Sequence, residues 1–264
     1  MAERKDYQLI NNSRFYVLLS AVLLSLAVTA WLRLQIASDQ LFYIRTQQVF
    51  GLISILYWYF TLVISPIGYV IGKQRTKHLE YARRAIGVSA FYFALLHAGV
   101  ALWGQLGGLE QLQYLPALFR WSLIGGLVAL GILFIMAATS FDKVVKFMNF
   151  RRWKWLHRLV YIGGVLAILH IWSIGTHLSY PAAQWVALVA LLVLAGLELF
   201  RVAKLLNQKY LHMNKLDTIT IFVTAWSVVG VLIASIPFYV QSYHSRHADN
   251  AAHVKSSRDD RQEN

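Results

Sequence analysis

Three histidines stand inside long apolar stretches of the sequence: His97, His157 and His170. An ionisable side chain is costly inside a membrane-spanning segment, and such residues usually serve a function. For one histidine alone, a hydrogen bond to a neighbour on its helix explains the position equally well. A neutral imidazole is also the commonest metal ligand in proteins, so the spacing of the three residues has to decide between these interpretations.

His97 and His170 occupy matching positions in their two stretches. Arg84 precedes His97 by 13 residues, and His157 precedes His170 by 13 residues. Thirteen residues of α-helix rise about 20 Å. If both stretches cross a membrane in the same direction, His97 and His170 lie at one depth in its outer half. Two imidazoles at one depth on parallel helices can fill both axial positions of a haem, an arrangement that suits electron transfer.

His157 and His170 do not lie on one stripe of an ideal helix. A separation of 13 residues leaves their side chains roughly 140° apart around the axis. A local deformation of the helix would bring them into line, and Gly163 and Gly164 stand between them. The same glycines would let a flat macrocycle approach the backbone. Ordinary packing of helices through small residues is the better explanation of either glycine alone.

The elements that must position these residues are membrane-spanning helices. The chain of 264 residues is 58% hydrophobic and 14% charged, whereas soluble domains average about 45–50% and 25%. Its apolar residues gather in runs of about twenty, the length that crosses a bilayer core. We predict an all-α, polytopic transmembrane helix bundle. The predicted spans are residues 15–34, 48–72, 86–104, 119–140, 156–174, 183–205 and 219–241.

Lysine and arginine are distributed unevenly between the connecting segments. Seventeen lie in the N-terminal segment and in the loops after the second, fourth and sixth spans, against seven in the other loops and the tail. The positive-inside rule therefore predicts a cytoplasmic N-terminal segment (1–14), a transmembrane domain (15–241) and an extracytoplasmic tail (242–264) in the cell's inner (plasma) membrane. The polar composition of the tail predicts disorder, which is also the better explanation of His244, His247 and His253.

Two sequence segments resemble a known family. Residues 81–87 (YARRAIG) followed by 93–97 (FALLH), and residues 153–161 (WKWLHRLVY) followed by Leu169-His170, are similar to the third and fifth helices of ferric-reductase-like transmembrane proteins. Within this family, the haem-binding membrane subunits of bacterial periplasmic methionine sulfoxide reductase systems look most similar. The resemblance covers residues 48–205 and implies a six-helix core, so that the span at 219–241 is a seventh, C-terminal helix outside it.

The resemblance implies haem b on His97 and His170. It also implies a flavin reductase or quinol as the cytoplasmic-side electron donor, and an extracytoplasmic redox partner as acceptor. No dinucleotide-binding fingerprint is present in the sequence, which favours a subunit of an oxidoreductase. The chain contains no cysteine, which excludes iron–sulfur clusters and thioether-linked haem.

The inner site departs from the family pattern, because Arg84 faces His157 where oxidase relatives have a second histidine. An arginine offers only donors and is a poor partner for iron. We expect Arg83, Arg84 and Arg158 to converge with His157 and hold a haem propionate or a flavin phosphate. The expectation is one firmly bound haem on His97 and His170. A weaker second haem, with His157 as its ligand, or a flavin (FMN or FAD) would use the inner site.

The sequence also bears on three other functions: transport or assembly without a cofactor, retinal binding, and nucleic-acid binding. A cofactor-free membrane transporter or assembly subunit remains the alternative, and the presence or absence of haem decides between the two. A retinal protein is disfavoured, because residues 219–241 contain no lysine for a Schiff base. The net charge of +13 comes from loops between apolar runs, so we expect contact with membrane lipid and no binding of nucleic acid.

Overall fold

The computed structural model describes residues 2–207, 223, 226–227 and 230–231. The described residues fold into helices joined by short turns, and they contain no β-strand. The chain divides into two compact units, residues 1–177 and 178–264. Most of the predicted seventh span (219–241) and the whole tail (242–264) lie outside the described residues.

Six helical segments of the described chain are long and apolar enough to cross a membrane. In lipid a backbone must satisfy its own hydrogen bonds, and a continuous helix does so. The segments overlap the first six predicted spans and confirm a polytopic helical membrane protein. They are Asn12–Gln35, Asp39–Ile71, Gln74–Gln105, Ala117–Ala138, Phe150–Ile174 and Pro181–Leu206.

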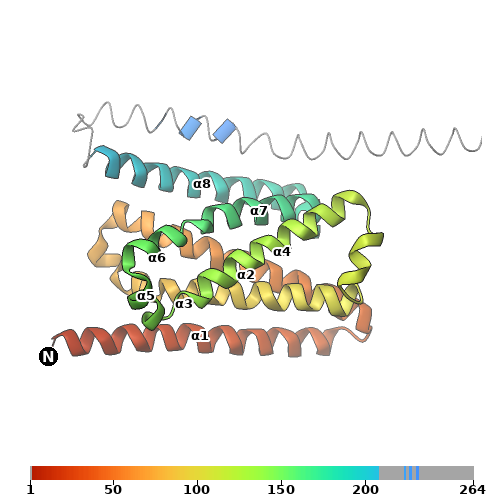
Figure 1. Ribbon diagram of the computed structural model, residues 1–264. Helices are drawn as coiled ribbons and strands as arrows, with labels where there is room; N and C mark the ends of the chain where they lie inside the picture. Colours follow the sequence, from red (N-terminus) through yellow and green to blue (C-terminus); the bar gives the residue numbers. More distant parts are fainter. Residues whose placement is uncertain (1, 208–222, 224–225, 228–229, 232–264) are drawn as a thin grey trace, which may run out of the picture. The chain divides into compact units, whose positions relative to one another are not determined.

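The order of the helices is simple (Figure 1). The short π-helix η1 directly continues α3. The second unit contributes α8. In chain order the elements are α1 (Ala2–Gln35), α2 (Asp39–Ile71), α3 (Lys73–Gly99), η1 (Val100–Gln105), η2 (Leu109–Tyr114), α4 (Ala117–Ala138), α5 (Asp142–Met148), α6 (Phe150–Leu156), α7 (Leu159–Ile174), η3 (Thr176–Ser179) and α8 (Pro181–Leu206).

The basic segments after the second and fourth spans are helical, where the sequence predicted loops. Gly72 alone separates α2 from α3, with φ of 100°, a conformation that favours glycine. Asn149 separates α5 from α6 at φ 67°, and its side chain accepts a hydrogen bond from the Arg151 amide. Hydropathy detects only the apolar part of a helix, so the polar turns that continue it were missed.

Helix pairs organise the first unit. The helix α2 packs along α3, α4 packs along α7, and α1 flanks α3 (Figure 1). Phe93 is fully buried between the rings of Phe50, Tyr57 and Tyr92. Because Phe93 lies one helical turn before His97, this aromatic core fixes the part of α3 from which His97 projects.

The helix that carries His157 and His170 is interrupted at His157–Arg158, between α6 and α7. Gly163 and Gly164, which could have permitted a deformation, both lie inside α7. A side chain on Gly163 would press on Ile132, and one on Gly164 would overlap the Trp58 ring. These glycines therefore allow close helix packing, as ordinary packing through small residues predicts.

Candidate functional site

His97 and His170 face each other in the first unit. Their ring centres lie 6.2 Å apart, and the ring planes are inclined by 81°. His97 comes from the end of α3, just before the π-helix η1, and His170 comes from the last turns of α7. Two helices that are far apart in sequence thus bring two imidazoles to one level.

The His97 ring is held by α2. Its Nδ1 lies 2.8 Å from the carbonyl oxygen of Gln47, so Nδ1 carries the proton and donates it. Gly51, one turn further along α2, lies against the same ring, and a Cβ at Gly51 would stand 2.9 Å from Nδ1. The missing side chain is what allows the imidazole to reach a carbonyl on the face of a continuous helix.

The His170 ring is held in the same way by α4. Its Nδ1 lies 2.9 Å from the carbonyl oxygen of Ser122, and a Cβ at Gly126 would stand 2.9 Å from Nδ1. The Ser122 hydroxyl also donates to the His170 carbonyl at 3.3 Å. Each histidine therefore has a carbonyl partner and, four residues later on the same helix, a glycine. Sequence reasoning missed all four of these residues, although Gly51 and Gly126 stand out as glycines inside apolar spans.

This arrangement fits an iron bound between the two rings. Both hydrogen bonds use Nδ1, which leaves Nε2 of each ring as the nitrogen for a metal. A bond from a first-row metal to imidazole nitrogen is about 2 Å long, so two rings on opposite sides of one iron have centres about 6 Å apart. The separation of 6.2 Å matches this spacing.

The end of the first unit that carries Arg84 and His157 contains a stack of three side chains. The His157 ring lies on the Trp153 ring with centres 4.0 Å apart, and the Arg84 guanidinium lies 4.9 Å from the Trp153 ring centre. Thr139 ties the stack to the end of α4: its carbonyl accepts from Trp153 Nε1 at 2.9 Å, and its hydroxyl lies 3.2 Å from His157 Nε2. One of the two ring nitrogens of His157 therefore already has a hydrogen-bond partner in the protein.

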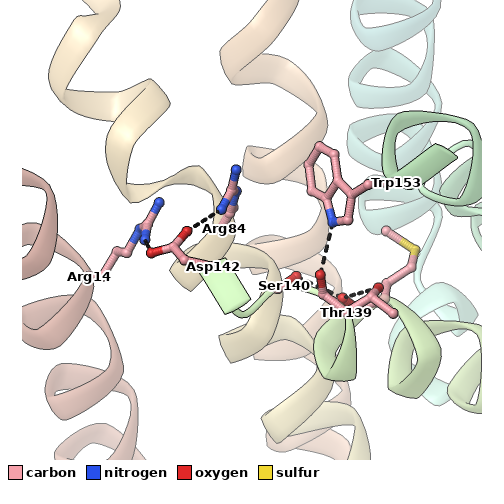
Figure 2. Close-up of polar contacts among 7 residues, drawn as sticks. Arg14, Arg84, Thr139, Ser140, Asp142 and Trp153 are labelled. Atoms are coloured by element: carbon pink, nitrogen blue, oxygen red, sulfur yellow. Dashed lines mark hydrogen bonds and ion pairs between the residues drawn. The ribbon is translucent and has the colours of Figure 1, made fainter. Parts of the chain in front are cut away.

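Arg84 is paired with a carboxylate. Figure 2 shows Asp142 between Arg84 and Arg14, with distances of 2.6 Å to Arg84 and 2.7 Å to Arg14. Of the three arginines expected near His157, Arg84 lies over the Trp153 ring, which in turn contacts the His157 ring. The Nε of Arg83 donates to the Thr61 carbonyl on α2, and Arg158 is exposed at the start of α7. Arg14 and Asp142 were not anticipated from the sequence.

A polar rim lies beside the facing histidines. The Gln47 side chain donates to Gln105, the last residue of the π-helix, and Gln48 donates to the Thr176 hydroxyl at 2.9 Å. These contacts fix η1 and η3, the segments that follow the two histidines. Among the described residues no group of three or more histidine, cysteine, aspartate or glutamate side chains could hold a metal ion. His244, His247 and His253 lie outside the described residues.

Comparisons with known proteins show which family the chain belongs to. The profile of the family described as "ferric reductase like transmembrane component" matches residues 18–168. The match includes His97 and ends two residues before His170. No solved structure is similar enough to count as a match.

Several curated relatives are named as haem-binding subunits MsrQ of protein-methionine-sulfoxide reductases. The chain is 33% identical to the one from Ralstonia nicotianae over 53% of this chain and 63% of the relative. It is 37% identical to the one from Deinococcus radiodurans, over 45% and 56%, and 34% identical to the one from Herminiimonas arsenicoxydans, over 42% and 50%. The chain thus matches between half and two thirds of the length of these relatives. Because the family profile covers more than half of its residues, the chain belongs to the ferric-reductase-like transmembrane family.

Proposed function

We propose that the chain is a haem-b protein that carries electrons across the inner membrane as a subunit of a reductase system. Electrons enter from a flavin or quinol donor on the cytoplasmic side, and an extracytoplasmic redox partner accepts them. The family and the six apolar helices support a membrane electron-transfer role, and the names of the relatives support haem. The N-terminus lies in the cytoplasm in this proposal, in keeping with the distribution of lysine and arginine.

The observation that carries the proposal is the pair of facing imidazoles. His97 and His170 would hold the haem iron, and the carbonyls of Gln47 and Ser122 orient the two imidazoles and keep the proton on Nδ1. A haem held there would supply a one-electron carrier. The chain's own contribution is to hold the ligands rigidly on helices, so that little rearrangement accompanies a change of charge.

The inner site has a different role in this proposal. His157 is hydrogen-bonded to Thr139 and stacked on Trp153, and the Arg84 guanidinium lies against the same Trp153 ring. These contacts favour one firmly bound haem on His97 and His170. The inner site then receives the electron donor, with Arg84 close to the charged group of a flavin. A weaker haem on His157 would first have to displace the Thr139 contact.

The test is the haem content of variants of the full chain in detergent or nanodiscs. His97→Ala and His170→Ala should each lose most of the haem and its reduced-minus-oxidised spectrum, while the protein still inserts in the membrane. His78→Ala is the matched control, because His78 lies on α3 with His97 but is exposed. Full haem content in both site variants would refute the ligand assignment. Absence of haem from the parent would favour the alternative, a transporter or assembly subunit.

A further inference from the structure

The polar rim beside the facing histidines is connected to the His97 ring by a short series of bonds. His97 Nδ1 lies 2.8 Å from the carbonyl oxygen of Gln47, and the carbon of that carbonyl is bonded to the backbone nitrogen of Gln48. The Gln48 side chain continues the route, because its amide donates to the Thr176 hydroxyl at 2.9 Å. One hydrogen bond and a few covalent bonds therefore join the imidazole to a side chain of the rim.

The corresponding route from His170 ends at an apolar side chain. The Ser122 carbonyl accepts from His170 Nδ1, and the residue bonded to that carbonyl is Leu123, which is half-buried. Of the two routes, the one through Gln48 reaches polar groups at the end of the helices. A water-soluble protein can meet such groups, whereas lipid covers the apolar faces of membrane helices.

Arg45 gives this part of the rim a positive charge. Its guanidinium donates to the side-chain oxygen of Gln48 at 3.0 Å, and none of the ion pairs of the described residues includes Arg45. Arg33, at the end of α1, is instead paired with Asp39 at 2.7 Å. An exposed guanidinium that an amide orients and no acid neutralises is suited to bind a carboxylate of another molecule.

We propose that Arg45, Gln48 and Thr176 form the docking surface for a water-soluble redox protein whose electron entry is edged by carboxylates. This inference rests on the proposed function, since the surface would serve a haem held by His97 and His170. One electron leaves the reduced chain and reduces the partner by one electron, and no covalent bond or proton changes place. Encounters between redox proteins are weak and use small interfaces, so a single fixed charge has a large effect on them.

The other helix pair offers a matched control. Arg45 lies two residues before Gln47, and Arg120 lies two residues before Ser122, so each arginine has the same spacing from a carbonyl that holds a histidine. Arg120 donates to the carbonyl oxygen of Gln113, in the segment before α4, at 3.5 Å. Reversal of either charge changes the net charge of the chain equally, so the two variants differ in where the charge lies.

The test uses the haem-containing full chain in nanodiscs of neutral lipid, with cytochrome c as the probe. Native cytochrome c is rich in lysine, and succinylation of those lysines gives an acidic form of the same redox protein. Surface plasmon resonance measures binding, and stopped-flow absorbance follows oxidation of the reduced haem. The basic segments at the opposite end of the helices repel native cytochrome c, so binding of this form reports on the rim.

Arg45→Glu should bind native cytochrome c about five- to tenfold more tightly than the parent at low ionic strength, and should reduce it faster by a similar factor. The gain should disappear at an ionic strength of about 1 M, where the Debye length is about 3 Å. Electron transfer to the succinylated form should not become faster. Arg120→Glu should stay within about twofold of the parent with both forms.

An equal gain in Arg45→Glu and Arg120→Glu would overturn the placement of the docking surface. A gain with both forms of cytochrome c would also overturn it, because that result would indicate an altered haem and not an altered surface. Unchanged haem spectra show that the variants are folded. A parent without haem would overturn the proposed function and the docking surface with it. If the parent contains haem and Arg45→Glu binds native cytochrome c no better, the docking surface alone is refuted.

Discussion

Substitutions at two adjacent glycines of α4 can distinguish the role of the His170 ring from a general effect on the helix. A Cβ on Gly126 would lie 2.9 Å from Nδ1, 3.1 Å from Cε1 and 3.3 Å from Cγ of His170. A Cβ on Gly125 would meet no atom within 4 Å. Gly126→Ala and Gly125→Ala therefore differ in one respect, since only the first presses on the imidazole.

The size of the effect follows from these distances. Ordinary contacts between such atoms are about 3.5–4.0 Å, so in Gly126→Ala the ring must retreat by roughly 0.5 Å or more. Metal–ligand distances tolerate about 0.2 Å. The retreat also stretches the bond from Nδ1 to the Ser122 carbonyl, and loss of such an orienting bond typically lowers metal affinity about 10–100-fold. We expect Gly126→Ala to bind haem about 10–100-fold more weakly than the parent.

The assay is a haemin titration of protein prepared with little haem, followed by pyridine extraction to give haem per protein. Gly125→Ala should bind haem like the parent and should be no less stable, because alanine favours a helix by up to about 1 kcal/mol over glycine. Parental haem affinity in Gly126→Ala would refute the reasoning, since it would mean that the His170 position against α4 does not matter for the cofactor.

Three further outcomes follow from the same contacts. Gly51→Ala should weaken haem binding as Gly126→Ala does, because its Cβ would stand 2.9 Å from His97 Nδ1, and Gly131→Ala, with open space, is its control. His157→Ala should keep one haem per protein by pyridine extraction, since His157 Nε2 is bonded to Thr139; two haems in the parent, with one lost in the variant, would make the chain a di-haem conduit. Reporter fusions at Asn149 and Asn250 should score on opposite sides of the membrane, and two cytoplasmic scores would contradict the topology.

The membrane spans and the matching depth of His97 and His170 could be predicted from the sequence, because both follow from numbers of residues along the chain. Runs of about twenty apolar residues mark helices whatever their neighbours are. Equal spacing from Arg84 to His97 and from His157 to His170 placed both later residues far along their helices, and in the structure their rings lie 6.2 Å apart. Whether they bind iron remains a prediction.

The hydrogen-bond partners of these residues could not be predicted from residue spacing. Gln47 and Ser122 contribute backbone carbonyls, which every residue type possesses, so no side-chain pattern reveals them. Asp142 pairs with Arg14 across 128 positions, and the contact depends on how α1 and α5 are brought together in the fold. The turn at His157–Arg158 was also missed, because neither residue is a strong helix breaker.

The α2–α3 pair and the α4–α7 pair hold their histidines by the same arrangement of a carbonyl and a glycine. On α2 a carbonyl at Gln47 is followed four residues later by Gly51, and on α4 a carbonyl at Ser122 is followed four residues later by Gly126. A helix carbonyl already accepts its own i+4 amide, and its second lone pair accepts the imidazole only where no side chain covers it.

Each histidine is thus fixed by a helix that precedes its own in sequence, His97 by α2 and His170 by α4. Neither pair can ligate an iron on both sides alone, because each presents one imidazole. A cofactor bound between the rings would therefore join the α2–α3 pair to the α4–α7 pair. Since both carbonyls that accept from Nδ1 belong to continuous helices, the two imidazoles should keep their positions when the charge at the site changes, which is what rapid electron transfer requires.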